Sequence, residues 1–145
     1  MTPLKIYFAG PLFTWGEREQ NKQIVAILRD LGHEVFLPQE SEQKNNVTPK
    51  GIFDSDMEGL NWSNVVVGCM DGPDPDSGTC FEVGNAYGKK WIVLYRTDIR
   101  EEGPPLGPYN LMMHARADAV LDCKWMIPDE IAAEINAALA KLAGI

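Results

Sequence analysis

The sequence has little of what marks several common protein classes. Its 145 residues include three cysteines and two histidines, and no apolar run approaches the ~18 residues that a membrane-spanning helix needs. Cys69, Cys80 and Cys123 lack the spacing of a metal site. An odd cysteine count without a secretory apolar segment favours buried free thiols in a reducing compartment. We therefore expect a cytoplasmic protein that does not associate with membranes.

Basic residues are also scarce. Thirteen Lys and Arg side chains stand against 21 Asp and Glu side chains, which gives a formal net charge of −8. A surface of this sign repels phosphate backbones and argues against a nucleic-acid polymer as partner, whereas a small neutral ligand is compatible with it. The length and the 45% of hydrophobic residues predict one globular domain over residues 1–145.

A cluster of acids raises the question of a metal loop. Calcium loops place oxygen ligands at alternate positions around a central glycine. Counting from Asp71, the alternate positions are occupied by Pro73 and Pro75 rather than by Asp74 and Asp76. We therefore predict no metal ion and no other cofactor.

Hydrophobic periodicity predicts a regular alternation of strands and helices. Short apolar runs predict strands at residues 4–10, 33–38, 64–70, 90–96 and 119–123. Helical spacing and helix-start residues predict helices at 14–32, 49–64, from 78 to about 88, 110–117 and 128–144, whereas 39–48 is polar and loop-like. This alternation is typical of an α/β fold, here a flavodoxin-like doubly wound five-stranded parallel sheet in the order 2-1-3-4-5 with helices on both faces.

Ligands of such sheets bind beyond the carboxyl ends of the strands, near the point where the strand order reverses. The predicted fold brings four segments to that edge. They are the end of the first strand from Tyr7 through Gly10 to Phe13, the residue Gln39, the segment 71–82, and the loop that ends at Asn110.

The stretch DPDSGTCFEVGNAYGKK (74–90) places two acids at this edge. Asp76 precedes a predicted helix, and Glu82 lies in that helix among four residues that we expect in the core: Phe81, Val83, Ala86 and Tyr87. We expect the helix dipole to keep Glu82 ionised despite burial. A fixed carboxylate can attack an electron-poor carbon while a second carboxyl assists the leaving group, as in glycosidic chemistry. The alternative is that Asp76 only caps the helix and Glu82 is a solvated helix residue.

Three stretches, in order along nearly the whole chain, resemble the nucleoside 2-deoxyribosyltransferase family. They are KIYFAGPLF (5–13), DPDSGTCFEVGNAYGKK, and YNLMM (109–113). The resemblance implies that Glu82 is the nucleophile, that Tyr7 donates a hydrogen bond to it, and that Asp76 and Asp56 contact the nucleobase, Asp76 also being a candidate acid.

The resemblance further implies contacts from the edge loops and from a second subunit. Gln39 matches a base-contacting residue, and Phe13, beyond Gly10, could stack on the base. Asn110 and Met112 match residues that a neighbouring subunit contributes, with Asn110 on the sugar 5′-hydroxyl. The implied protein is a homo-oligomer, a dimer or a hexamer, with shared active sites.

The implied activity is transfer of 2-deoxyribose between nucleobases, with deoxynucleosides and free bases as substrates. Glu82 would attack C1′ and form a glycosyl ester, and a second base would then attack the same carbon, so that configuration is retained. The chain ends in an Ala-rich helix where some relatives have an aromatic tail, which leaves the details of sugar recognition open.

Two alternatives stay open at this point. A relative that hydrolyses 2′-deoxynucleoside 5′-monophosphates would share the Tyr and acid set but needs a polar phosphate pocket, where this chain has Pro11, Leu12 and Phe13. A non-enzymatic flavodoxin-like nucleotide-binding module would need a hydroxyl-rich phosphate loop, and a receiver domain would need acids after the first strand. The stretch IYFAG (6–10) offers neither.

Overall fold

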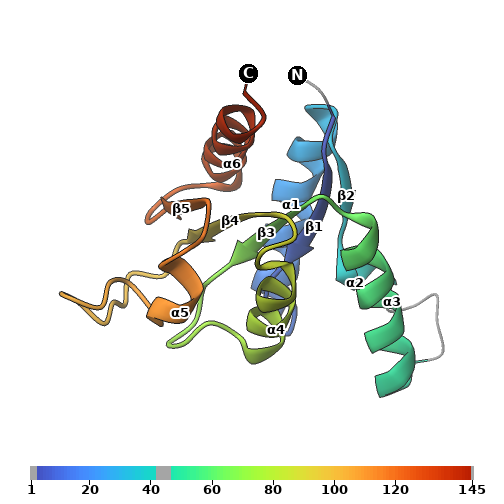
Figure 1. Cartoon of the computed structure of the whole chain (residues 1–145), viewed down its shortest axis with the longest axis horizontal. Coiled ribbons are helices and arrows are strands. Elements are labelled where there is room, and N and C mark those ends of the chain that lie inside the picture. The colour runs from blue at the N-terminus through green and yellow to red at the C-terminus, as the bar shows by residue number, and fades with distance from the viewer. Residues whose placement is uncertain (1–2, 42–46, 145) are drawn as a thin grey trace.

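The computed structural model describes residues 3–41 and 47–144 and contains one parallel sheet (Figure 1). Its strands are β1 (Lys5–Ala9), β2 (Glu34–Phe36), β3 (Val65–Cys69), β4 (Trp91–Arg96) and β5 (Ala119–Asp122), in the order β2-β1-β3-β4-β5. The predicted α/β fold, strand order and flavodoxin-like class are confirmed. The order reverses at β1, which pairs with both β2 and β3 and therefore lies at the switch point.

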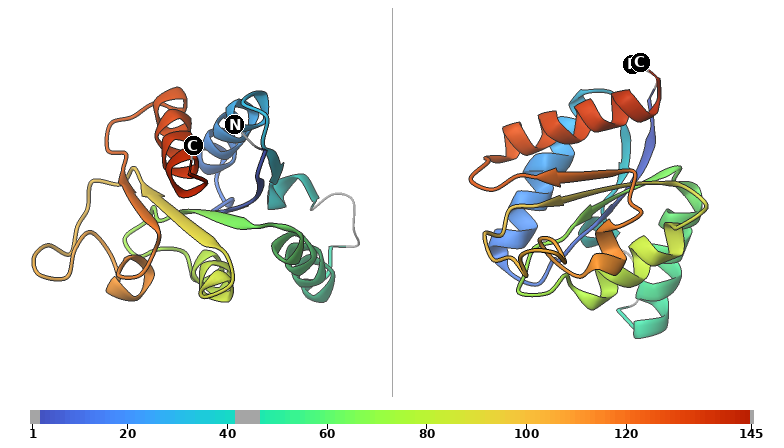
Figure 2. Two further views of the ribbon diagram at one scale, coloured as in Figure 1. Left: turned by 45° about the horizontal axis from the view of Figure 1, so that its top comes forward. Right: turned by 60° about the vertical axis from the view of Figure 1, so that its left-hand side comes forward.

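Helices cover both faces of the sheet (Figure 2). On one face lie α1 (Trp15–Asp30) and α6 (Pro128–Leu142), which contact each other. On the other face lie α3 (Pro49–Trp62), α4 (Ser77–Ala86) and the short α5 (Leu111–His114). A further short helix, α2 (Pro38–Ser41), follows β2.

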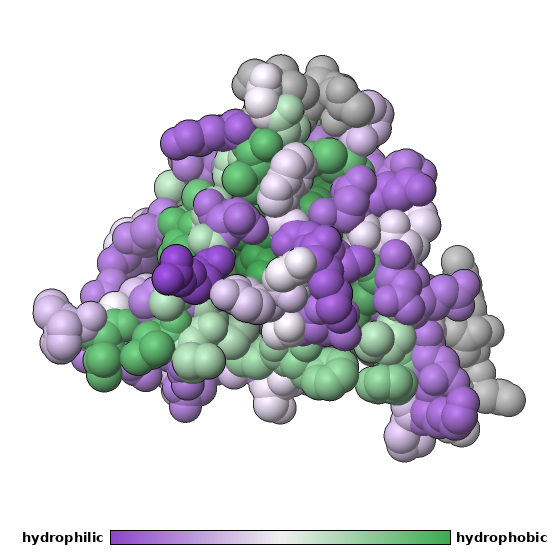
Figure 3. Space-filling view, viewed as in Figure 1, coloured by the Kyte–Doolittle hydropathy of each residue, from purple (hydrophilic) through white to green (hydrophobic). Residues whose placement is uncertain are grey.

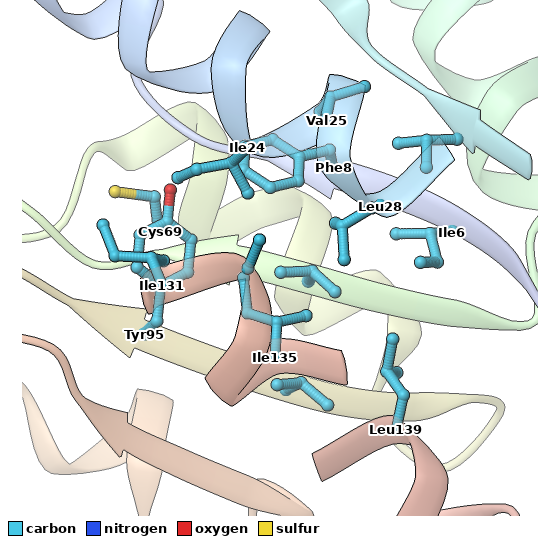
Figure 4. Packing of buried hydrophobic residues seen from close by; sticks show 14 of the residues in the cluster. Ile6, Phe8, Ile24, Val25, Leu28, Cys69, Tyr95, Ile131, Ile135 and Leu139 are labelled. Atoms are coloured by element: carbon cyan, nitrogen blue, oxygen red, sulfur yellow. The ribbon is translucent and has the colours of Figure 1, made fainter. Parts of the chain in front are cut away.

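The alternation of side chains along β1 divides the core into two clusters. Ile6 and Phe8 point towards α1 and α6, where they pack with Ile24, Leu28 and other apolar residues (Figure 4). Tyr7 and Ala9 point to the opposite face, towards α3 and α4, and belong to the second cluster. This strand therefore delivers one polar side chain, Tyr7, into the layer between the sheet and α4.

Local signals set the limits of α1. Thr14 accepts a hydrogen bond from the Glu17 backbone N–H, and the Glu17 carboxylate accepts from the Thr14 backbone N–H in return, which forms a capping box. At the other end Gly32 has a φ of +101°, a conformation that glycine adopts without the steric cost that a Cβ brings. These two signals place the start of α1 soon after β1 and its end just before β2.

Several predictions about single elements were wrong. Residues 39–48 were predicted as loop, but Pro38–Ser41 form α2; residues 42–46 lie outside the described part of the chain. Phe81 and Tyr87 were predicted in the core, yet both are more than half exposed, because the buried apolar positions of that helix are Val83 and Ala86. Cys80 is half-buried, whereas Cys69 and Cys123 are buried as predicted.

Within residues 3–41 and 47–144, no helix is long and apolar enough to cross a membrane. In the same segments, no group of three or more His, Cys, Asp or Glu side chains is arranged to hold a metal ion.

Candidate active site

A cleft of about 390 Å³ opens at the carboxyl edge of the sheet, next to the switch point. It lies between the β1–α1 loop, α3 and the start of α4. Its volume is in the range of small-molecule sites. The lining is mostly apolar and includes three carboxylates, those of Asp56, Asp76 and Glu82. The full set of lining residues is Gly10, Leu12, Phe13, Pro38, Pro49, Ile52, Phe53, Asp56, Met57, Leu60, Asp76, Gly78, Thr79, Phe81 and Glu82.

Glu82 lines the cleft, and Tyr7 lies behind Glu82 in the core. The Tyr7 hydroxyl donates a short hydrogen bond to Oε2 of Glu82, across 75 positions of sequence. Tyr7 is fully buried, and its ring stacks on Phe36 with centroids 5.4 Å apart. The stacking and the hydrogen bond together fix one carboxylate oxygen of Glu82 and the direction in which the other can point.

The structure corrects the prediction that the helix dipole keeps Glu82 ionised. Burial raises the pKa of Glu82 to about 7, the Tyr7 hydrogen bond lowers it in part, and the charges of Asp56 and Asp76 raise it further. Glu82 is the sixth residue of α4, beyond the first turn where the dipole acts most strongly. Near neutral pH, Glu82 therefore exchanges between its ionised and protonated forms.

The pKa of Tyr7 is raised far above its usual range, first by burial and then by the charge of Glu82. Tyr7 consequently keeps its proton and acts only as a donor to Glu82. The pair combines a permanent donor with a carboxyl group that titrates near neutrality.

Asp76 has a structural role as well as a place in the cleft. It is the N-cap of α4, and its Oδ2 accepts hydrogen bonds from the Thr79 backbone N–H at 2.9 Å and from the Thr79 hydroxyl at 3.0 Å. The helix-capping alternative is therefore true of Asp76, and the cap also holds its carboxylate against the cleft. Glu82, in contrast, is not the solvated helix residue of that alternative, because it is partly buried and bonded to Tyr7.

Asp56, Gly10 and Phe13 also line the cleft. Asp56 comes from α3, opposite α4. A Cβ on Gly10 would lie 3.0 Å from the Cβ of Cys69, so the close approach of the first loop to β3 accounts for this glycine. Phe13 is largely exposed at the mouth of the cleft.

Gln39 does not line the cleft. Its amide is used between α1 and α2: Nε2 donates to the Arg18 backbone carbonyl at 2.9 Å, and Oε1 accepts from the Asn21 amide at 3.1 Å. Asn21 also donates to the Pro11 carbonyl. Gln39 therefore supports the first loop from behind in this structure, and its contact with a base stays a prediction.

Asn110 and Met112 do not line the cleft of their own chain either. Asn110 caps α5 by accepting a hydrogen bond from the Met112 backbone N–H at 2.9 Å, and the Met112 side chain is 81% exposed. Both residues thus lie on the surface of the chain.

A second cavity, of about 410 Å³, lies beside the 103–108 loop and contains none of the predicted site residues. Arg96, almost fully buried, holds its inner wall and donates to backbone carbonyls of Met70, Gly72 and Arg100. Because Arg96 also packs 5.6 Å from the Tyr109 ring, it joins the loops that follow β3 and β4.

Sequence reasoning missed several residues of the cleft, Thr79 and Phe53 among them. Thr79 is buried and bonds Asp76, and its position three residues after the cap was an available signal. Phe53 lines the cleft one helical turn before Asp56, and the i, i+3 spacing places both side chains on one side of α3.

The fold and the cleft together define an α/β protein with a cleft that is lined by carboxylates and lies at the switch point of a doubly wound sheet. A family model described as nucleoside 2-deoxyribosyltransferase matches residues 6–130, and the chain belongs to this family. The family resemblance predicted from the sequence is thereby confirmed, and membership indicates a nucleoside-processing enzyme. No curated protein sequence matches the chain.

Solved structures are similar over most of the chain. A conserved protein from Enterococcus faecalis V583 has 25% sequence identity and a TM-score of 0.71, with 94% of this chain and 99% of that chain covered. A 2-deoxyribosyltransferase from the psychrotolerant bacterium Bacillus psychrosaccharolyticus has 26% identity and a TM-score of 0.68, covering 88% and 89%. A CMP N-glycosidase from Clostridium botulinum, at 15% identity, TM-score 0.58 and coverage of 90% and 97%, shares the fold alone.

Proposed function

We propose that this protein transfers 2-deoxyribose from one nucleobase to another through a covalent glycosyl ester on Glu82. The observation that carries the proposal is the Tyr7–Glu82 hydrogen bond at the inner end of a cleft that also holds Asp56 and Asp76. Family membership and the similar 2-deoxyribosyltransferase support the same activity.

The proposed reaction has two balanced steps. The ionised Glu82 carboxylate attacks C1′ with Oε1, because Tyr7 occupies Oε2. The C1′–N bond breaks, its electron pair goes to the base nitrogen, and Asp76 or Asp56 supplies the proton that the departing base takes up. The second base then attacks C1′ from the face that the first base left, and its N–H proton returns to the carboxylate that protonated the first base. The bond from C1′ to Glu82 breaks with its electron pair on the carboxylate, and the configuration is retained.

Hydrolysis is the competing outcome of the same intermediate, since water can attack C1′ instead of a base. The apolar part of the lining favours a planar base over water, because the side chains of Leu12, Phe13 and Phe81 offer no hydrogen bonds to hold a water molecule.

The charge of the cleft supports nucleosides rather than nucleotides as substrates. Among its described lining residues are three carboxylates and no Arg or Lys. A 5′-monophosphate would be repelled by this field and would find no cationic partner. This observation weighs against a 5′-monophosphate N-glycosidase activity, although a CMP N-glycosidase shares the fold.

We also propose that two copies share each site. Asn110 and Met112 lie exposed on α5, and apolar surface lies near them at Leu106 and Leu111. Figure 3 shows hydrophobic side chains gathered along the lower edge of the molecule, over α4 and α5. A neighbouring copy seated there would bury this surface and place Asn110 on the sugar 5′-hydroxyl of the other site.

The test is incubation of the purified protein with deoxyinosine, with and without adenine, followed by chromatography. Transfer predicts deoxyadenosine plus hypoxanthine only when adenine is present; hypoxanthine and free deoxyribose without adenine indicate hydrolysis. Deoxyinosine 5′-monophosphate run in parallel should not be cleaved. No reaction with either donor would overturn the proposal.

A variant tests the acid role within this scheme. Asp76→Asn keeps a good helix cap but cannot supply a proton. It should slow base departure, and an unchanged rate across the pH range would remove Asp76 from that role.

A further inference from the structure

Two phenylalanines that line the cleft pack against each other. Phe53 of α3 and Phe81 of α4 have ring centroids 6.0 Å apart and planes tilted by 51°, within the geometry of attractive aromatic pairs. Both line the same cleft as Asp56 and Glu82. The pair therefore forms a bridge between the two helices that bear these carboxylates.

The pair is exposed although it is aromatic. Phe53 is 51% exposed and Phe81 55% exposed, while the sheet-facing sides of α3 and α4 are already covered by Leu60, Val83 and Ala86. The core thus does not need either ring. Clustered apolar surface inside a concave site, next to polar groups, is typical of surface that a ligand covers.

The position of the pair along the cleft indicates which part of a ligand it would meet. Glu82 is partly buried and bonded to the fully buried Tyr7, whereas the two rings are half exposed. Phe53 precedes Asp56 by one helical turn, which corresponds to about 4.5 Å along the axis of α3. A sugar held at Glu82 therefore directs its base past Asp56 and towards the two phenylalanines.

The size of the base then decides whether the pair is reached. A one-ring base bound with its polar edge at Asp56 ends near that carboxylate. A fused second ring extends farther outward and brings its face or edge against Phe53 and Phe81. Stacking on aromatic side chains accepts any planar heterocycle of sufficient reach and needs no hydrogen bond.

We propose that Phe53 and Phe81 determine base specificity by forming an aromatic rim that binds two-ring, purine-type bases more tightly than one-ring bases. The inference rests on the proposed function, because it takes the cleft as the site of a nucleobase. It adds the class of base that the cleft selects and the two residues that select it.

The experiment measures binding of free adenine and free cytosine by calorimetry, without turnover, to the native chain and to Phe53→Leu/Phe81→Leu. Leucine keeps apolar bulk and removes the ring face, and both positions are exposed enough for the fold to tolerate it. The control is Tyr87→Leu, which removes an exposed aromatic ring from the C-terminal end of α4, outside the lining of the cleft. Thermal unfolding of each variant establishes that it is folded.

The expected result is adenine binding that is roughly tenfold weaker in the double variant and unchanged in the control, with cytosine binding weak and equal in all three proteins. Equal losses for adenine and cytosine, no loss for adenine, or tighter binding of cytosine than adenine by the native chain would each overturn the inference. The exchange assay separates the two proposals. A protein that binds adenine in this pattern but transfers no sugar would contradict the proposed function, whereas the proposal that Phe53 and Phe81 select the base would still hold.

Discussion

Glu82 and Tyr7 each change the acidity of the other, and the reactivity of the site depends on this pair. Burial raises the pKa of Glu82 to about 7, and the Tyr7 hydroxyl opposes that rise by stabilising the carboxylate. The nucleophile therefore becomes available as the pH rises through neutrality, and its availability depends on one hydrogen bond.

Tyr7→Phe removes that hydrogen bond and leaves the ring that stacks on Phe36. The pKa of Glu82 should then rise above about 7, so the acidic limb of the kcat/KM profile should move to higher pH. At neutral pH the rate should fall roughly ten- to a hundredfold, with the gap to the native chain narrowing in alkali. Rates measured from pH 5 to 9 test this, and an unshifted limb would show that Tyr7 does not tune Glu82.

Glu82→Ala should lose transfer by several orders of magnitude while remaining folded, because no other group in the cleft forms the ester. Intact-mass measurement with a slow 2-fluoro-deoxynucleoside should show one sugar attached to the native chain and none to the variant. Label found on another residue, or near-normal exchange by the folded variant, would show that the nucleophile has been assigned wrongly.

Glu82 should also make stability depend on pH. Its pKa lies near 4.5 when unfolded and about 7 when folded, so the folded state holds more protons between these values. The free energy of unfolding should therefore fall as the pH rises from about 5 to 8. Glu82→Gln has no such titration, so relative to the native chain it should gain on the order of 1–2 kcal/mol over this range. Urea unfolding at pH 5 and 8 measures the free energy of unfolding of both proteins. If this free energy changes by the same amount between the two pH values in both proteins, the prediction is wrong.

At the scale of elements, the contact between α3 and β2 controls the position of Tyr7. A Cβ added to Gly59 would lie 2.7 Å from the ring of Phe36, the ring on which Tyr7 stacks. The absence of a side chain at Gly59 thus lets α3 approach β2 closely. The cleft wall that carries Asp56 is held at its distance from Glu82 by this packing.

Gly59→Ala should destabilise the protein by roughly 1–3 kcal/mol and reduce kcat/KM, because it displaces Phe36 towards Tyr7. Gly84→Ala is the matched control, since it is an exposed helical glycine of α4 with nothing within 4 Å of the added Cβ. That change should leave activity intact and stabilise by up to ~1 kcal/mol through helix propensity. Phe36→Leu combined with Gly59→Ala should recover part of the lost stability; no recovery would place the clash elsewhere.

At the scale of the whole molecule, activity should depend on association. Glu82→Ala and Asn110→Ala chains should each be inactive, because one lacks the nucleophile and the other lacks the group that holds the 5′-hydroxyl of a neighbour. Mixing them should restore part of the activity, since a hybrid dimer assembles one intact site. Absence of rescue after subunit exchange has been verified, or a fully active monomer in solution, would exclude shared sites.

Much of this architecture was predictable from local sequence patterns. All five strands and the principal helices α1, α3, α4 and α6 were predicted within a few residues of their limits, because alternation, capping residues and glycines act over one or two turns. The short α2 was missed, since a helix of four residues carries too little periodicity to detect. Phe81 was wrongly predicted in the core. The sequence shows that this residue is apolar, but it does not show whether the sheet covers its side of the helix or a cleft exposes it.

The sequence by itself determined the sheet order, the edge at which the acids gather and the family motifs, since each depends on neighbouring residues and on chain topology. Only the tertiary structure decided that Tyr7 reaches Glu82 across 75 positions, that the pKa of Glu82 rises instead of staying low, and that the amide of Gln39 is used within the loop. It alone brought Phe53 against Phe81. The physical reason is that burial, local dielectric and contact between helices arise from packing of distant segments, which no short stretch of sequence contains.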